Sequence, residues 1–390
     1  MNRKSVAVLD VRSSAVTALI GERGVNNTFV FKGVHTEKYD GFADASFFDL
    51  RALQKTVFKA LEAVEHSCGD RIRELYIGVP GEFVRVVTTR HLMSFQNKRR
   101  VTSYDLTVLF ERGMTEPVSG YTQIRRAAVC YVTSDMRRTI DPVGMISDSI
   151  EGYLSYFFAD DRFLEIFRNM LAEYGIRKIH FLPTSLAEAM YLIPSEERDE
   201  YAILLDIDSI SMTFSLVCGN GIVYENACSF GGGHVTAQLY TDESQMDGIP
   251  FEAAEAMIGK VNLSGREEDD SLIEYVDKSQ VYTLPMRFLK EKVKEGLDLI
   301  CEVISGDLEL CDDGSIDYKP ILLTGGGITG IRGAREHLSN RLNRVVEIIA
   351  PNLPYYNKAS QSSLLSLLDM ALQIKRENSF FYKLFNGIGG

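Results

Sequence analysis

The chain has 390 residues, 45% of them hydrophobic, with 42 basic against 54 acidic side chains and a net charge of −12. This length allows a sizeable core and more than one domain, which excludes a small peptide scaffold. The negative charge would repel a phosphate backbone, so we expect no nucleic-acid binding.

The N-terminal apolar run, residues 6–9, is too short for a signal peptide. No window approaches the roughly 20 apolar residues of a spanning helix. We therefore expect a cytoplasmic protein whose membrane contact, if any, is peripheral. The six cysteines form no C-x-x-C pair, which favours reduced, packed thiols.

The two halves of the chain open with the same pattern. Residues 6–9 form an apolar run that ends in Asp10, and a second predicted strand follows at 15–20. Residues 202–205 likewise run into Asp206, before predicted strands at 212–217 and 222–227 joined by an Asn-Gly turn. The repeat predicts two similar lobes that face one another across a cleft.

Such a cleft suits nucleotide phosphates. Turn amides and hydroxyls from both lobes can surround the phosphate groups, while the paired aspartates hold Mg²⁺ through water. Two acidic strand ends without any ligand would give the same pattern, and that alternative stays open.

A third feature is the glycine run Gly325, Gly326 and Gly327, between a predicted strand at 320–324 and a predicted helix at 333–343. Backbone without side chains can approach a ligand closely at such a turn. Residues 325–330 also match G-x-G-x-x-G, but too few residues follow for the strand–helix units of a dinucleotide-binding fold.

Several segments, in their order along the chain, resemble the FtsA family of the actin and hexokinase superfamily. They are DPVGM at 141–145, TSLAEA at 184–189, GGGHVT at 231–236, FEAAEA at 251–256 and LTGGG at 323–327. The resemblance covers nearly the whole chain. It implies an α/β protein with the actin-like ATPase fold, in which two ribonuclease-H-like lobes enclose a nucleotide cleft and carry a small inserted α+β domain.

The resemblance also implies domain limits. The expected parts are a first lobe at 1–85 and 345–376 with a return at 166–195, an inserted domain at 86–165, a second lobe at 196–344, and a tail at 377–390.

The nucleotide would be ATP or ADP with Mg²⁺, the metal held through water by Asp10 and Asp206. The resemblance implies these nucleotide-binding residues: Asp10, Arg12, Ser13, Ser14, Asp206, Ser209, Ser211, Gly231, Gly232, Glu255, Gly325, Gly326 and Gly327. Glu188 is a candidate for orienting a water molecule, with an exposed helix residue as the alternative.

Both phosphate loops depart from the family pattern. Arg12 replaces a glycine in the first loop, where it could still contact a phosphate, and Asp208 lies where the second loop has glycines. A carboxylate about 4 Å from a phosphate oxygen costs on the order of 4 kcal/mol at an effective dielectric of 20, or roughly a thousandfold in affinity. We therefore expect weakened nucleotide binding and no efficient ATPase activity, unless Asp208 points into solvent and costs nothing.

FtsA-like proteins polymerise, bind the tubulin-like FtsZ and tether it to the membrane through a C-terminal amphipathic helix. The resemblance thus implies a division scaffold on the inner face of the cell membrane, at the division site. Its partners would be an FtsZ-like protein, copies of itself and the membrane surface. Two alternatives stay open: an active actin-like ATPase or kinase, and a pilus or secretion-assembly adaptor, although the 141–145 segment favours division.

The C-terminal region contains two different patterns. Residues 360–373 predict a helix packed on the first lobe. The tail then presents an aromatic, locally basic segment typical of an interfacial membrane anchor, namely Phe380, Phe381, Lys383, Leu384 and Phe385. The alternative is a tail that docks on the protein itself. Two basic clusters in the inserted domain, at 98–100 and 137–138, indicate either a contact face or solvated loops.

Overall fold

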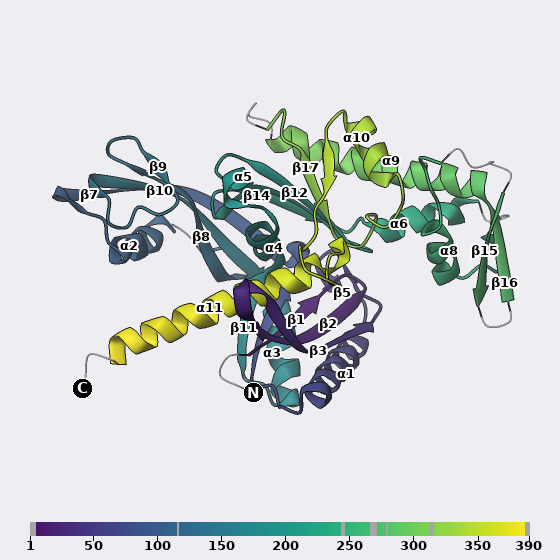
Figure 1. Ribbon diagram of the computed structural model, residues 1–390, viewed down its shortest axis with the longest axis horizontal. Helices are drawn as coiled ribbons and strands as arrows, with labels where there is room; N and C mark the ends of the chain where they lie inside the picture. Colours follow the sequence, from purple (N-terminus) through teal and green to yellow (C-terminus); the bar gives the residue numbers. More distant parts are fainter. Residues whose placement is uncertain are drawn as a thin grey trace.

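The computed structural model describes residues 5–114, 117–242, 246–265, 271–277, 280–311 and 316–386. Two sheet-and-helix lobes form the centre of the molecule (Figure 1). A smaller sheet and a β-hairpin extend from opposite sides of this centre, and the helix α11 projects away from it.

The first lobe is a five-stranded sheet in the order β11-β6-β1-β2-β3. Every residue of its central strand β1 is buried, because β1 pairs with β2 on one side and β6 on the other and helices pack on the sheet. The strands are β1 Val6–Val11, β2 Ala15–Arg23, β3 Phe29–Lys38, β6 Glu74–Val79 and β11 Lys178–Pro183. The helices are α1 Leu50–Cys68, α3 Asp161–Tyr174, α4 Thr184–Leu192 and α11 Ser362–Asn386.

The second lobe repeats this plan, with a five-stranded sheet in the order β14-β13-β12-β17-β18. Its strands are β12 Ala202–Ile207, β13 Met212–Cys218, β14 Gly221–Cys228, β17 Ile321–Thr324 and β18 Val346–Ile348. Its helices are α5 Ser195–Arg198, α6 Gly232–Ala237, α8 Phe251–Ile258, α9 Met286–Cys311 and α10 Ala334–Leu342. The projecting hairpin pairs β15 Leu272–Asp277 with β16 Gln280–Pro285.

The duplication extends to the register of the strands. Asp10 lies opposite Thr17 in the β1–β2 pair, and Asp206 lies opposite Thr213 in the β12–β13 pair. In both lobes the strand with the aspartate also has a parallel neighbour on its other side. The two aspartates therefore occupy equivalent positions, as the repeat predicted.

The inserted domain has a four-stranded sheet, in the order β7-β10-β8-β9, and a core of its own. Its elements are β7 Val84–Arg100, α2 Ser103–Gly113, β8 Tyr121–Thr133, β9 Arg138–Thr139 and β10 Ile146–Asp160. The predicted limit at 165 lies inside α3, whose Phe163 and Phe167 are buried in the first-lobe core.

Several of the predicted basic residues contact the protein itself. Arg99 donates to both carboxylate oxygens of Asp105, at 2.8 and 2.7 Å. Arg138 donates to the Sγ atom of Cys218 in the second lobe, at 2.8 Å. These two side chains therefore hold the domain together and join it to the second lobe.

The short elements lie in the connections. They are the strands β4 Phe42–Ala43 and β5 Ser46–Phe47, and the 3-10 turns Val25–Asn27, Gly81–Phe83, Gln238–Thr241 and Ala359–Gln361.

Helix α11 is longer than the sequence predicted. It runs from Ser362 to Asn386 without a break, so a helix end at 373 was wrong. Residues 374–378 contain neither glycine nor proline, and nothing in their local chemistry stops a helix. The side chains predicted to contact the membrane lie outside the described residues. Over the part of the chain that the structure describes, no helix is long and apolar enough to span a membrane.

Candidate functional site

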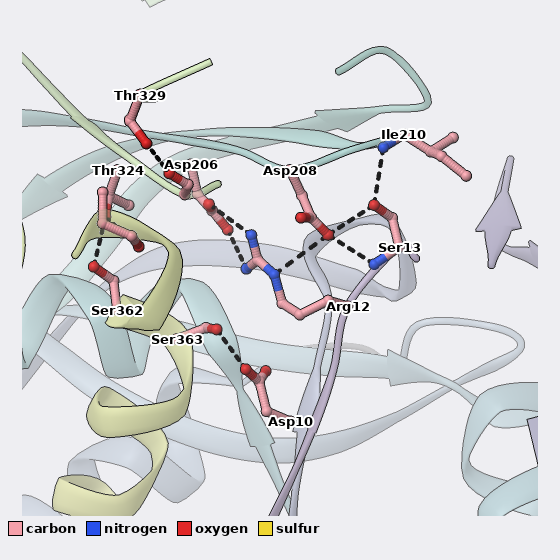
Figure 2. A network of polar contacts seen from close by, with 12 residues as sticks. Asp10, Arg12, Ser13, Asp206, Asp208, Ile210, Thr324, Thr329, Ser362 and Ser363 are labelled. Carbon is pink, nitrogen blue, oxygen red and sulfur yellow. Dashed lines mark hydrogen bonds and ion pairs between the residues drawn. The ribbon is translucent and has the colours of Figure 1, made fainter. Parts of the chain in front are cut away.

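The two equivalent turns face each other between the lobes (Figure 2). Asp10 and Asp206, at the ends of β1 and β12, are 3% and 9% exposed. Gly325 packs against the turn that follows β12, which we call the second turn; the turn after β1 is the first. The φ of Gly325 is +89°, and a Cβ atom there would lie 2.2 Å from the carbonyl oxygen of Ile207. Only glycine allows this approach. The two aspartates and the glycine bend therefore lie close together between the lobes, and Asp206 lines a cavity there; their role as a binding site stays a prediction.

The guanidinium of Arg12 lies across this cleft between two carboxylates of the second lobe. It donates to both oxygens of Asp206, at 2.6 and 2.9 Å, and its Nε atom lies 3.3 Å from Asp208. The three side chains are 12–15% exposed. Arg12 is therefore fully engaged within the protein and does not point toward an open phosphate site.

Asp208 connects the lobes in the opposite direction, from the second lobe to the first. We call the contacts among Arg12, Ser13, Asp206 and Asp208 the bridge. Its Oδ2 atom accepts from the backbone N–H of Ser13 at 2.8 Å and from the Ser13 hydroxyl at 2.7 Å. The Ser13 Oγ atom in turn accepts from the backbone N–H of Ile210 at 2.9 Å. The alternative in which Asp208 points into solvent is therefore wrong, since the side chain is directed at the opposing lobe.

The charges in the bridge support one another. Burial by itself raises the pKa of Asp208, but the Arg12 charge and the Ser13 hydrogen bonds outweigh it, so the pKa is lowered. Burial likewise acts to lower the pKa of Arg12, and the two carboxylates overcome it and raise the pKa well above its usual value. Both groups are therefore charged at neutral pH.

The remaining carboxylates of the cleft behave differently. Burial raises the pKa of Asp10 to about 6, although Arg12 and a 2.6 Å hydrogen bond from the Ser363 hydroxyl oppose this. Burial, and then the negative charge of Asp206, raise the pKa of Glu188 well above its usual range. Glu188 is only 1% exposed, so its interpretation as an exposed helix residue was wrong.

The predicted glycines of the second lobe use their amides within the protein. Gly232 donates to the carbonyl oxygen of Asp208 at 2.8 Å, and Gly231 donates to the Nδ1 atom of His234 at 3.1 Å. A Cβ atom on Gly232 would lie 2.1 Å from the carbonyl oxygen of Gly327. These glycines pack the second turn against the glycine bend, and their role in nucleotide binding stays a prediction.

The cleft contains two cavities. The inner one, between Ser13, Ser211, Glu188 and the bridge, has about 20 Å³ of room for water-sized molecules, enough for about one water. The outer one is open and has about 680 Å³ of such room. Of the predicted residues it is lined by Ser14, Ser209 and Glu255. In this arrangement the inner cavity does not fit a phosphate group.

The metal prediction gains no support from the geometry. Both carboxylate oxygens of Asp206 accept hydrogen bonds from Arg12. Within the described ranges, no group of three or more His, Cys, Asp or Glu side chains could hold a metal ion.

Sequence reasoning missed the hydroxyls at the start of α11. Ser363 donates to Asp10, and Ser362 accepts from the Thr324 hydroxyl at 2.7 Å, just before the glycine bend. Both serines are at most 2% exposed. Serines inside an otherwise apolar helical run, beside Leu364 and Leu365, were the signal that could have revealed them.

Comparison with known proteins agrees with this geometry. No family model matches the chain. It is 20% identical over 382 residues to the cell division protein FtsA of Streptococcus pneumoniae strain D39, which covers 95% of this chain and 80% of that protein. Among solved structures, the type IV pilus complex PilM-PilN matches 95% of this chain and 99% of its own, with a TM-score of 0.63 and 13% identity. MreB5 of Spiroplasma citri bound to ADP matches 96% of this chain and 98% of its own chain, with a TM-score of 0.56 and 10% identity.

The paired lobes and their turns have the actin-like ATPase fold, so the predicted fold is confirmed. Along its sequence the chain is similar to FtsA over nearly its whole length, so the predicted resemblance is also confirmed. The likeness to PilM-PilN and MreB5, at 13% identity and below, shows the fold alone.

Proposed function

We propose that this protein is a cell-division scaffold that polymerises and tethers FtsZ-type filaments to the inner face of the cytoplasmic membrane. The observation that carries the proposal is the similarity to FtsA over 95% of the chain. The fold supports it too, because the resemblance to FtsA implied an actin-like fold and this chain has that fold, as MreB5 does.

The C-terminal helix supports the membrane part of the proposal. α11 packs against β1, β2 and β6 of the first lobe and then leaves the body (Figure 1). Its 25 residues correspond to about 37 Å of helix. Residues 374–390 combine three basic and one acidic side chain with several aromatic ones. A single anchor of this kind binds membranes only marginally, so attachment depends on a polymer that presents many tails.

Nucleotide has a secondary role in this proposal. MreB5 is an ADP-bound protein of the same fold. In this chain Arg12 and Asp208 line the inner cavity, which is too small for a phosphate group. A nucleotide would therefore bind weakly, from the outer cavity, and would regulate or stabilise the protein without efficient hydrolysis. Phosphate release from Mg-ATP well above background would contradict this part.

A vesicle assay tests the tether. The purified protein, FtsZ filaments and vesicles with anionic lipid are sedimented together, with the full chain or with residues 378–390 deleted. We expect FtsZ to pellet with vesicles only when the full chain is present. Tyr318→Ala is the matched control, because it removes an aromatic side chain that is 98% exposed elsewhere on the protein. Equal pelleting with and without the tail would rule out the anchor.

A second candidate is an adaptor for pilus or secretion assembly, which the likeness to the PilM-PilN complex favours. Co-purification from cells separates the two candidates. Recovery of an FtsZ-type protein supports the division scaffold, whereas recovery of a pilus-assembly protein in its place supports the adaptor.

A further inference from the structure

We propose that the chain carries its own ligand for the cleft: the Asp208 carboxylate takes the place of a nucleotide phosphate, the Arg12 guanidinium takes the place of its cation, and together they hold the lobes closed. The inference rests on the proposed function for the weakened nucleotide binding, and it does not depend on FtsZ or the membrane.

The contacts of Asp208 are those of a bound anion. A phosphate in such a turn accepts from backbone amides and hydroxyls that point at it. Here one carboxylate oxygen accepts from both the N–H and the Oγ–H of Ser13, at 2.8 and 2.7 Å. Charge-assisted hydrogen bonds of this kind are the strong ones. The first turn is therefore already supplied with an anion from the opposite lobe.

Arg12 supplies the positive charge that such an anion needs. Asp206 is at the position predicted to hold Mg²⁺, and both of its oxygens accept from the Arg12 guanidinium. The same guanidinium lies 3.3 Å from Asp208 through Nε. One fixed cation thus offsets the charge of both carboxylates, at the place where the sequence predicted a metal ion.

The bridge crosses from one lobe to the other in both directions. Arg12 and Ser13 come from the β1–β2 turn, whereas Asp206, Asp208 and Ile210 come from the strand β12 and its turn. The amides of Ser13 and Ile210 both end on groups of the opposing turn. With about 20 Å³ left beside them, the turns are in contact and not held apart.

A different cross-cleft contact provides a matched control. The Asp44 backbone N–H donates to the Ser229 hydroxyl at 2.6 Å, and that hydroxyl lies 3.0 Å from the Glu82 carboxylate. This contact also joins the two lobes, but it uses neither of the turns. Ser229→Ala therefore removes a lobe-to-lobe contact and leaves the internal ligand in place.

The test compares nucleotide-free wild type with the variant Arg12→Gly/Asp208→Gly by calorimetric titration with Mg-AMPPNP. We expect the double variant to bind at least about tenfold more tightly, because it removes the carboxylate that repels a phosphate and frees Asp206 from Arg12, although an attracting charge is lost as well. Ser229→Ala should keep the wild-type affinity. Equal affinity of wild type and double variant would overturn the proposal.

Hydrogen exchange gives a second, direct measurement. The amides of Ser13 and Ile210 should be protected in nucleotide-free wild type and unchanged by Mg-AMPPNP. In the double variant they should exchange rapidly until Mg-AMPPNP is added. Rapid exchange in nucleotide-free wild type would overturn the proposal, because the lobes would then be open.

Asp208→Asn keeps the experiment decisive if the double variant does not fold. It removes the charge and preserves the size of the side chain, and an amide oxygen still accepts from Ser13. We expect tighter Mg-AMPPNP binding than in wild type, by at least about tenfold. No gain in a folded Asp208→Asn protein would contradict the assignment. A result of either sign leaves the vesicle assay unaffected, so the two proposals fail separately.

Discussion

Removal of Arg12 should destabilise the cleft, because this side chain contacts two carboxylates. In Arg12→Met the carboxylates of Asp206 and Asp208, which are 12% and 15% exposed, lose their shared counter-ion. Removing one partner of a largely buried pair costs about 3–5 kcal/mol, because a charge is left without compensation. With an unfolding entropy of about 2.1 cal/mol/K per residue, a chain of 390 residues should lose about 4–6 °C in Tm.

A double-mutant cycle isolates the pair from other effects of the substitution. Arg12→Met, Asp208→Asn and the double variant are compared with wild type by thermal unfolding, followed by far-UV circular dichroism because the chain contains no tryptophan. The coupling between two contacting charges should be about 1–3 kcal/mol, so the double variant loses less than the two single losses combined.

The control is an exposed ion pair on the same lobe. Lys59 pairs with Glu37 at 2.7 Å, but the lysine side chain is 64% exposed. Lys59→Met should therefore cost less than about 1 kcal/mol. The reasoning is refuted if Arg12→Met lowers the Tm no more than Lys59→Met does, or if the losses in the cycle are simply additive.

Two further predictions concern the same cleft. Since the pKa of Asp10 is about 6 in the folded protein, against 3.8 ordinarily, the native state binds more protons between these values and its stability falls as pH rises through them. Asp10→Asn should therefore raise the Tm at pH 7.5, by the equivalent of roughly 1–3 kcal/mol. At pH 3.5 the substitution should leave the Tm unchanged. A gain in Tm of equal size at both pH values would contradict the assigned cause. Gly325→Ala should destabilise the protein by about 1–3 kcal/mol, because Gly325 has a positive φ and lies against the Ile207 carbonyl. The control is Gly330→Ala, where a Cβ atom would meet open space. In the same melting experiment it should change the free energy of unfolding by no more than about 0.5 kcal/mol.

The lobes and their shared cleft could be predicted from sequence because their signals are local. An apolar strand that ends in an aspartate and is followed by small polar residues occurs at Asp10 and again at Asp206. Equivalent positions in a duplicated fold must be equivalent in space, and the strand register confirms it. The glycine bend was predictable for the same reason, since glycine runs at strand ends indicate close backbone approach.

The internal bridge could not be predicted from local patterns. Arg12 and Asp208 are separated by 196 positions in the sequence. Their residue types predict a possible phosphate contact and a charge that repels phosphate, which the arginine could partly offset, but they do not predict a direct contact between the two side chains. Each change by itself would leave an unpaired charge in a narrow cleft. Only the folded arrangement shows that they compensate one another, with both turns in contact.

The helix α11 connects this bridge to the far end of the molecule. At its first turn Ser363 donates to Asp10 and Ser362 accepts from Thr324, so the start of the helix is bonded to both lobes at the base of the cleft. Its buried leucines then fix it along the first lobe before it leaves the body (Figure 1). Because the helix continues without a break, the direction in which the C-terminal segment leaves is set by packing at the cleft. In the proposed scaffold, a closed bridge therefore also holds that direction the same in every subunit.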